Sequence, residues 1–385
     1  MPPLYTDKKP RVLAFHLPQF HPIPENDEWW GQGFTEWTNV VKGRPLFDGH
    51  YQPRLPSEQG FYDLRLPEAR ALQAHLARIA GIDGFIYYHY WFNGRRLLER
   101  PVTEILRSKQ PDFPFCLCWA NEPWSRNWDG QGHKVIMPQT YSEDDDKNHI
   151  NALLPAFSDA RYIKFNGCPL LLVYRPSSLP DVRHTASLWR EAAARYGFPG
   201  LVLAAVRAFP GEFRNAVDFG MDFSVEFKPN GTVCGPTLQS DNPLDIGHRL
   251  HRIWRYDDMV RVSLQTPIPD YPFFPGVCPS WDNSVRRKEG AAIFIDSTPE
   301  KYGAWLTEVL VRERLRPQAE SIVAINAWNE WAEGNHLEPC HRWGRAYMEA
   351  TRNAIDSADV LAASLASFQF GQIVRNTPGF SLRGN

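Results

Sequence analysis

Residues 321–328 read SIVAINAW, and residues 329–338 continue as NEWAEGNHLE. The first stretch is an almost uninterrupted apolar run, which is typical of a strand that is buried on both faces in a parallel sheet. The second stretch places three carboxylates, a tryptophan, two asparagines and a histidine directly after that strand. A buried strand that ends in polar groups predicts a barrel whose chemistry lies at the carboxyl ends of its strands.

Seven similar runs precede this one, and helical stretches separate several of them. The runs are residues 11–18, 84–91, 115–120, 170–174, 201–206, 223–227 and a weaker 275–281. Stretches at 66–80, 186–196 and 299–314 predict helices, and the first opens with Pro67 and stops at Gly81. Strand and helix alternating eight times predict an α/β fold, a (β/α)₈ TIM-type barrel.

The barrel is expected to form a single catalytic domain over residues 1–350, followed by a C-terminal helix and tail over residues 351–385. Long loops are predicted after strands one and six, at residues 20–62 and 227–255, where they would shape the active face. An open doubly wound sheet is the alternative. The first strand ends in PQFHP at 18–22, which lacks the glycine-rich turn typical of that fold.

Composition excludes several classes of function. The net charge of −2 provides no basic excess for nucleic acid, and no run of about 18 apolar residues predicts a membrane span. The six cysteines lack Cys-x-x-Cys or zinc spacing, so we expect reduced thiols in a cytoplasmic protein. The histidines show no metal-binding spacing, and we expect neither a catalytic metal nor a cofactor. Nothing in the sequence indicates the oligomeric state.

Two carboxylates after the last strand, Glu330 and Glu333, are the candidate catalytic pair. A glutamate beside tryptophan in a poorly solvated pocket favours its neutral form, while a better hydrogen-bonded neighbour stays ionised. Glycoside cleavage requires this division of roles, with the two carboxyl groups about 5–7 Å apart. Residues three apart face the same way in a turn or 3₁₀ segment, and Gly334 would let the chain leave the strand there. The alternative is a pair of surface salt bridges.

Other polar and aromatic residues near the predicted strand ends are candidates for binding a sugar. The 14 tryptophans, several of them beside Asn, Asp or Glu, favour a groove that stacks apolar sugar faces over a merely bulky core. Glu122 could instead be an acid/base, and Glu226 could instead pair with Lys228 or an arginine. The candidate substrate-binding residues are His21, Trp37, Tyr87, His89, Trp91, Trp119, Asn121, Glu122, Glu226, Trp281, Asp282, Asn329, Trp331 and Glu338.

A set of longer motifs resembles the WbsX-type proteins of bacterial polysaccharide and O-antigen genes, over roughly residues 11–350. The motifs are LPQFHPIPEN (17–26), WWG (29–31), GFTEW (33–37), GHYQP (49–53), GFYDLR (60–65), YYHYWF (87–92), WANE (119–122), WDN (281–283) and WNEWAEG (328–334). That family is similar in turn to glycoside hydrolase family 99, the endo-α-1,2-mannosidases, which are (β/α)₈ barrels. The chain departs from the family pattern at His16, where Tyr is more frequent, and at Pro123, where Asn is usual.

The resemblance implies roles for the glutamate pair, because the hydrolases carry theirs in an Asn-Glu-Trp-x-Glu-Gly motif. Glu330 would act as base on the sugar 2-hydroxyl, giving an anhydro-sugar intermediate and net retention. Glu333 would act first as acid and then as base.

Three functions stay open, each with an oligosaccharide or polysaccharide as partner. The first is a retaining glycoside hydrolase acting on an α-linked glycan, with mannose-containing glycans among the candidates. The second is a glycosyltransferase or transglycosylase in lipopolysaccharide O-antigen biosynthesis. A nucleotide-sugar transferase often needs an Asp-x-Asp metal motif, and the one match is Asp144–Asp146, in an acidic run typical of a helix start. The third is a catalytically inactive carbohydrate-binding protein.

Overall fold

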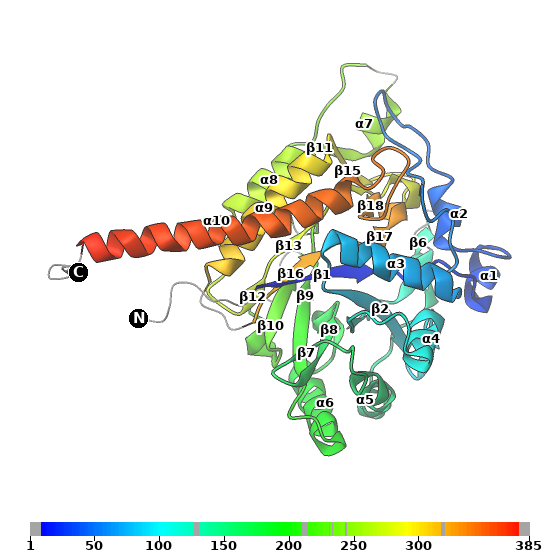
Figure 1. The fold of residues 1–385 in the computed structure, drawn as a ribbon. Helices are drawn as coiled ribbons and strands as arrows, with labels where there is room; N and C mark the ends of the chain where they lie inside the picture. The colour runs from blue at the N-terminus through cyan, green and yellow to red at the C-terminus, as the bar shows by residue number, and fades with distance from the viewer. Residues whose placement is uncertain are drawn as a thin grey trace.

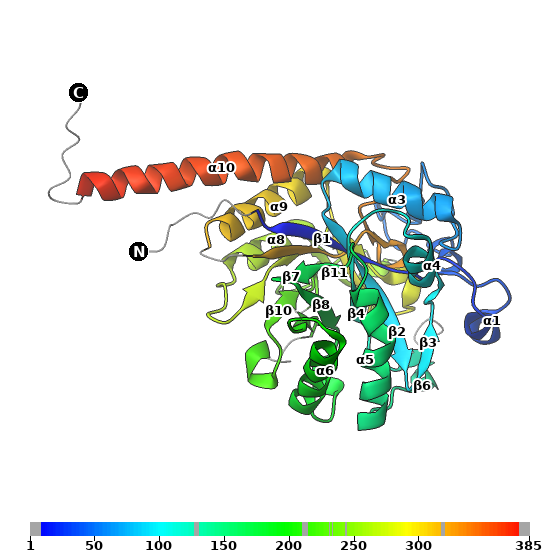
Figure 2. The ribbon, with the colours of Figure 1, turned by 60° about the horizontal axis from the view of Figure 1, so that its bottom comes forward.

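The structure is a computed structural model that describes residues 9–126, 131–209, 215–230, 232, 234–242, 245–316 and 320–376. Its centre is a ring of parallel strands surrounded by helices (Figures 1 and 2). Neighbouring strands follow the order β10-β9-β8-β4-β2-β1-β16. The predicted (β/α)₈ barrel is therefore confirmed. The ring consists of β1 (Arg11–His16), β2 (Gly84–Phe92), β4 (Phe115–Trp119), β8 (Cys168–Val173), β9 (Val202–Arg207), β10 (Phe223–Glu226), β12 (Phe273–Phe274), β13 (Gly276–Val277) and β16 (Ile322–Ile325).

The seventh strand of the ring is split into β12 and β13 by Pro275. A proline has no N–H to donate, so it interrupts a strand ladder. Phe273 of β12 pairs with Ser224 of β10, whereas Gly276 of β13 pairs with Ala324 of β16. The two halves thus bond to different neighbours and close the ring, which explains why this run was the weakest in the sequence.

The outer layer consists mainly of helices that follow the strands. The predicted helix 299–314 coincides with α9, and α6 begins four residues before the prediction because the Asp181 side chain accepts a hydrogen bond from the backbone N–H of His184. Between β9 and β10 the described residues hold only the 3₁₀ helix η3 (Ala216–Phe219), so the expected alternation is interrupted there. The helices are α3 (Pro67–Ala80), α4 (Arg100–Ser108), α5 (Glu143–Phe157), α6 (Val182–Tyr196), α8 (Tyr256–Gln265), α9 (Pro299–Arg314) and α10 (Ala346–Asn376).

Shorter elements lie in the connections, and those after strands one, seven and eight gather near the carboxyl ends of the strands (Figure 1). β11, β15 and β14 form a small separate sheet, and β17 pairs with β18 in a hairpin directly after β16. The helical elements are α1 (Pro24–Trp30), α2 (Glu36–Val40), α7 (Ile246–Leu250), η2 (Pro176–Ser178), η4 (Ser284–Arg286) and η5 (Trp331–Glu333). The strands are β3 (Arg95–Leu97), β5 (Trp124–Arg126), β6 (Gln131–Met137), β7 (Lys164–Phe165), β11 (Arg252–Arg255), β14 (Trp281–Asp282), β15 (Ala292–Ile295), β17 (Asn329–Glu330) and β18 (Asn335–His336).

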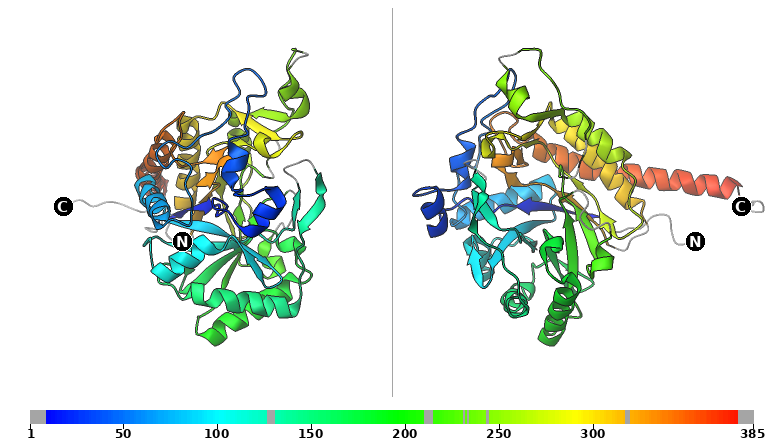
Figure 3. Two further views of the ribbon diagram at one scale, coloured as in Figure 1. Left: turned by 90° about the vertical axis from the view of Figure 1, so that its right-hand side faces the viewer. Right: turned by 180° about the vertical axis from the view of Figure 1, so that it is seen from behind.

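Helix α10 packs along α9 and α3 and then extends beyond the barrel (Figures 2 and 3). It starts at Ala346, slightly before the predicted end of the barrel domain, and residues 377–385 of the predicted tail lie outside the described residues. Among the helices that the structure describes, none combines the length and the apolar character needed to cross a bilayer.

Aromatic side chains fill the barrel interior. Phe15 of β1 stacks on Tyr88 of β2 at 5.7 Å between ring centroids and meets Phe227 edge-on at 5.0 Å. Tyr174, directly after β8, contacts both Tyr88 and Phe227. Because successive side chains of a strand point to opposite faces, these contacts identify which residues of each strand face inward.

The close packing of β10 and β13 at Gly276 can be tested by substitution. A Cβ at this position would lie 2.2 Å from the carbonyl oxygen of Glu226. We expect Gly276→Ala to lower the free energy of unfolding by about 1–3 kcal/mol, since β10 and β13 would have to separate. Urea denaturation measures the change. Gly200→Ala is the control, because its Cβ would meet only the Cys168 sulfur at 3.3 Å. Equal stability of the two variants would contradict the tight closure.

Candidate active site

One guanidinium connects three carboxylates at the carboxyl end of the barrel. Arg286, at the end of η4, contacts Glu36 Oε1 at 2.7 Å, Glu330 Oε2 at 3.2 Å and Glu333 Oε1 at 2.8 Å. Glu36 starts α2 in the loop after β1, and Arg286 comes from the connection after the seventh strand. The cluster therefore joins three βα connections that are distant in sequence. The predicted pair, Glu330 and Glu333, lies together on this one arginine.

The local chain path brings the two glutamates to the same side. Glu330 ends β17, and residues 331–333 form the 3₁₀ helix η5, in which residues three apart lie one above the other. Gly334 follows with φ +58°, a left-handed conformation that favours glycine, and the chain returns as β18. The 3₁₀ turn and the exit at Gly334 agree with the conformation that the sequence spacing required.

Burial and charge control the protonation of the pair. Burial raises the pKa of Glu330 to about 8; the positive charge of Arg286 lowers this pKa, and the charge of Glu333 raises it. Burial also raises the pKa of Glu333, against the opposing effect of Arg286. Three carboxylates around one guanidinium leave excess negative charge, which favours a proton bound within the cluster near neutral pH. The Glu333 side chain is 18% exposed, compared with 5% for Glu330.

Inward-facing tyrosines and a tryptophan adjoin the carboxylates. Burial, and after it the charge of Glu330, raises the pKa of the Tyr88 and Tyr90 phenols, which therefore remain hydroxyl donors. The Tyr90 ring meets the half-buried Trp124 edge-on at 5.0 Å, and Trp29 of α1 lies 5.9 Å from Trp124. The surroundings of the pair thus combine hydroxyl groups and aromatic faces, the groups that sugar recognition uses.

Two predicted sugar-binding residues instead hold the hairpin. Asn329 Oδ1 accepts a hydrogen bond from the Leu17 N–H at 2.7 Å, and its amide donates to the Leu17 carbonyl at 3.0 Å. Glu338 accepts from the side chains of Tyr62, Gln73, Gln59 and Trp331. Both residues are almost fully buried and their acceptor oxygens are bonded to protein groups, so the structure places them in the support of the hairpin. Trp331, 1% exposed and stacked on His336 at 3.7 Å, likewise belongs to this support.

The residues of β2 that were predicted to line the groove point away from the barrel interior. Trp91 donates to Asp145 of α5 at 2.9 Å, and His89 Nε2 lies 2.9 Å from His149 Nε2 of the same helix. Tyr87 contacts His16, which is itself bonded to Gln73 of α3. These side chains point into the helix layer, because the inward face belongs to Tyr88 and Tyr90. A strand alternates with period two, so an error of one residue reverses the face.

The residues at and after the end of β4 differ in exposure: two are buried and support the fold, and one lies at the rim of the barrel. Trp119 is fully buried, donates to the Trp91 carbonyl and packs on His149 and Trp189 of the helix layer. Asn121 is also buried and exchanges hydrogen bonds with the backbone of Arg175. The structure therefore places Trp119 and Asn121 in the support of the strand end and not at its rim. Glu122 is about one-third exposed and pairs with Arg175 at 2.7 Å, so it stays a candidate for binding.

The remaining predicted residues lie beneath or beside the cluster. Asp282 is buried and accepts from His50 and Gln52 at 2.7 Å each; against burial, the His50 bond and nearby charges hold its pKa at about 2. Trp281 is buried in β14 and Trp37 donates to the Tyr62 carbonyl, so both stabilise loops. His21 Nδ1 lies 2.9 Å from the Pro18 carbonyl, and burial lowers its pKa to about 4. These contacts place Asp282, Trp281 and Trp37 in the support of the loops, and His21 stays a candidate.

Glu226 lies away from the pair. Val225 and Phe227 are buried in the interior, so Glu226 between them points outward, where it pairs with Lys228 at 2.9 Å. It lines a separate cavity between the barrel and α8 and α9. The structure does not bring Glu226 together with the pair, and it shows the alternative pairing with Lys228.

Sequence reasoning missed Arg286, Glu36, Tyr88, Tyr90 and Tyr174. Glu36 lies in the GFTEW motif and Arg286 follows the WDN motif by three positions, so proximity to conspicuous motifs was the available signal. The contacts of Arg286 and Glu36 with the pair depend on the packing of three connections that are distant in sequence. Within the described part of the chain, no group of three His, Cys, Asp or Glu side chains could hold a metal ion.

The model of the family described as glycosyltransferase WbsX matches residues 12–351. The chain belongs to the WbsX family. Two curated relatives come from two strains of Xanthomonas campestris pv. campestris, and both are described as uncharacterized protein WxcX. One is 44% identical to this chain over 358 residues, and the other is 45% identical over 361 residues. The matches cover 92% of this chain but 51% of each relative, so this WbsX chain spans about half their length.

Solved glycoside hydrolases share the fold of this WbsX chain. The GH99 endo-alpha-mannosidase from Bacteroides thetaiotaomicron has a TM-score of 0.56 at 13% identity, covering 92% of this chain and 98% of that one. A glycoside hydrolase-like protein has a TM-score of 0.58, also at 13% identity, with coverages of 92% and 96%. Family and fold are those of carbohydrate-active enzymes.

Glu330 should make the stability of the protein depend on pH. Its folded pKa of about 8 exceeds the ordinary value of 4.5, so the stability it confers is complete below about pH 4.5 and is lost as pH rises through 8. We expect Glu330→Gln to be more stable than the unmodified protein at pH 8.5, by a few kcal/mol, because one pKa unit corresponds to about 1.4 kcal/mol. At pH 5 the gain should shrink.

Urea denaturation at the two pH values measures this difference. Glu308→Gln is the matched control, because Glu308 lies on the exposed side of α9, with its side chain 48% exposed. A gain of equal size at pH 5 and pH 8.5 for Glu330→Gln would contradict the raised pKa.

Proposed function

We propose that this WbsX-family chain is a retaining glycoside hydrolase that cleaves an α-linked glycan, with Glu330 and Glu333 as its catalytic pair. The observation that carries the proposal is the shared contact of both carboxylates with Arg286 in a buried, aromatic-walled end of the barrel. Glycoside cleavage needs two carboxyl groups of different protonation within reach of one linkage. A structural ion pair would not require two carboxylates with raised pKa values beside hydroxyl donors.

The roles follow the resemblance to family 99 hydrolases. Glu330 takes the proton of the sugar 2-hydroxyl while that oxygen attacks the anomeric carbon, and Glu333 donates its proton to the leaving oxygen. Water then opens the anhydro-sugar: Glu333 removes a proton from the water, and Glu330 returns a proton to the 2-oxygen. The greater exposure of Glu333 suits contact with a leaving group and with water. Because its pKa is raised, Glu330 is a stronger base than an ordinary carboxylate once it has ionised, and in that reacting state the proton of the pair lies on Glu333.

Arg286 supports both steps through its charge. Its guanidinium lowers the pKa of each glutamate against the effect of burial, so that one carboxyl of the pair can ionise. Glu36 holds this guanidinium with its Oε1, which accepts from both Nε and Nη2. We therefore infer that Arg286 and Glu36 position the pair and set its shared proton.

Transfer to a sugar acceptor is the second candidate, and the family description as glycosyltransferase favours it. The same pair could pass the sugar to a hydroxyl instead of water. A nucleotide-sugar route through the acidic run receives no support, because Asp145 accepts from Trp91 and Asp146 accepts from Thr185, both in buried positions.

Glutamine variants test the assignment. On a panel of α-linked oligosaccharides and 2,4-dinitrophenyl α-glycosides, we expect Glu330→Gln and Glu333→Gln each to lower kcat on oligosaccharides by about 10²–10⁴-fold. The 2,4-dinitrophenyl leaving group needs no protonation, so Glu333→Gln should retain much more activity on it than Glu330→Gln. Mass spectrometry of the products, with and without a sugar acceptor, distinguishes hydrolysis from transfer.

Glu308→Gln is again the control and should keep full activity, since that side chain lies in the outer helix layer. Unchanged turnover in either variant of the pair would overturn the proposed mechanism. Glycan binding without turnover in the unmodified chain across the whole panel would instead favour an inactive carbohydrate-binding protein.

A further inference from the structure

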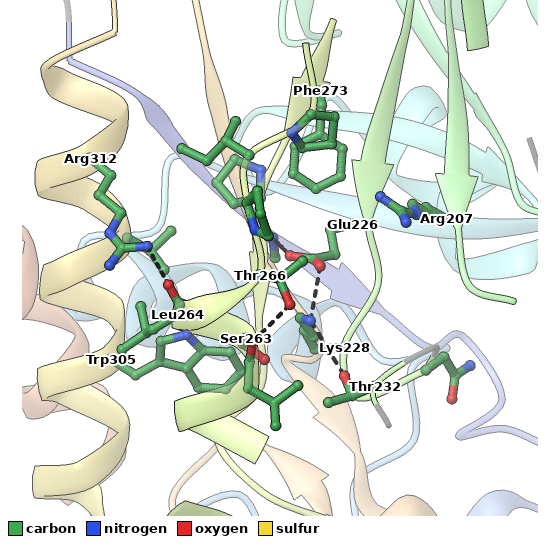
Figure 4. A pocket seen from close by; sticks show the side chains of 18 of the residues that line it. Arg207, Glu226, Lys228, Thr232, Ser263, Leu264, Thr266, Phe273, Trp305 and Arg312 are labelled. Carbon is green, nitrogen blue, oxygen red and sulfur yellow. Dashed lines mark hydrogen bonds and ion pairs between the residues drawn. The ribbon is translucent and has the colours of Figure 1, made fainter. Parts of the chain in front are cut away.

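A cavity of about 300 Å³ lies on the outer flank of the barrel (Figure 4). Its walls come from β10, the split seventh strand and helices α8 and α9. Arg207 and Phe209, which lead from β9 toward η3, form one edge, where the helix layer is reduced to a 3₁₀ turn. Its described lining residues are separate from the Arg286 cluster, and its volume is at the lower end of the range for small-molecule sites.

A buried lysine marks the polar wall of this cavity. The Lys228 side chain is 7% exposed, pairs with Glu226 Oε1 at 2.9 Å and donates to Thr232 Oγ1 at 3.3 Å. An ammonium group carries three N–H donors, so a ligand can take the third. The other oxygen of Glu226 accepts from the Gly276 N–H at 3.2 Å, which fixes the ion pair in place.

The charges around the cavity leave one cation in excess. With a single exception, the charged residues that line it form ion pairs within the described part of the chain: Glu226 with Lys228, Arg312 with Glu308, and Glu313 with Arg316. The exception is Arg207, whose guanidinium lies over the Phe273 ring at 5.8 Å and donates to the Tyr271 hydroxyl. Among the described residues it has no carboxylate partner. A guanidinium beside a buried ammonium favours an anionic group.

The opposite wall combines apolar side chains with the ion-paired Arg312 and Glu313 and the hydroxyls of Ser263 and Thr266. Helix α8 contributes Val262 and Leu264, α9 contributes Val309, and the loop after α8 contributes Ile268, which is 46% exposed at the rim. Figure 4 shows Trp305 of α9 and Leu264 across the cavity from Lys228 and Arg207. Arg207, the cation without a carboxylate partner among the described residues, thus lies on the strand side of the cavity, while α8 and α9 supply aliphatic groups and an indole opposite it, which suits a ligand with a charged head and an apolar body.

We propose that this cavity binds a small amphipathic anion, with its carboxylate or phosphate head at Arg207 and Lys228 and its apolar body against α8 and α9. The site is independent of the Glu330–Glu333 pair. Phe227 packs on Phe15 in the barrel interior, whereas its neighbours Glu226 and Lys228 line the cavity. The end of β10 and the residues after it therefore lie between the cavity and the barrel interior.

Calorimetric titration of the full chain with octanoate, octyl phosphate and 1-octanol tests the proposal. We expect saturable one-to-one binding of at least one of the two anions, and octanoate and octyl phosphate together show which head group is preferred. Neutral 1-octanol should bind at least about tenfold more weakly, since it lacks the charge-assisted hydrogen bonds. Binding of neither anion, or equal binding of the alcohol, would overturn the proposal.

Two variants locate the binding. Arg207→Gln should weaken the anion by about tenfold and leave 1-octanol unchanged, because only the head-group cation is lost. Ile268→Glu should also weaken the anion, since it places a like charge at the rim. Ile79→Glu is the matched control, an exposed isoleucine on α3 away from the cavity. Binding that neither cavity variant changes, with thermal unfolding unaltered, would place the ligand elsewhere and contradict the proposal.

Discussion

A single guanidinium, that of Arg286, holds the carboxyl end of this barrel together. A buried charge is stable only when it is paired, and here one cation serves three carboxylates from separate connections. Glu36 comes from the loop after the first strand, and Glu330 and Glu333 come from the hairpin after the eighth. These connections can meet only if the ring closes, which the split seventh strand accomplishes. The chemistry of the site therefore depends on the closure of the barrel.

The polar residues beneath the cluster keep its geometry. Asn329 bonds both backbone groups of Leu17 and so fastens the hairpin to the end of β1. Glu338 receives four donors from residues of the first connection, the third helix and η5. Asp282 fixes the loop that carries Arg286 through His50 and Gln52. Polar residues that appear catalytic in the sequence can thus be the supports that keep catalytic residues in position.

Periodicity and motif reasoning predicted the barrel and the proximity of Glu330 and Glu333, because the strands are continuous apolar runs and the 3₁₀ turn follows from the spacing and Gly334. The same reasoning failed on side-chain direction. Residues 84–91 are buried on both faces of the strand, so they show no alternation of polar and apolar residues. Nothing in their pattern therefore indicates that Tyr88 and Tyr90, and not His89 and Trp91, face inward. Arg286 could not be predicted, since its importance comes from three partners that only the closed fold assembles.

The most direct test of the central claim is a crystal structure of the Glu333→Gln chain with an intact α-linked oligosaccharide. We expect the glycosidic oxygen to lie at hydrogen-bond distance from the side chain of residue 333. The 2-hydroxyl of the adjacent sugar should lie at hydrogen-bond distance from Glu330, and both side chains should contact Arg286. A glycan bound beyond hydrogen-bond reach of both side chains, or at another face of the barrel, would contradict it.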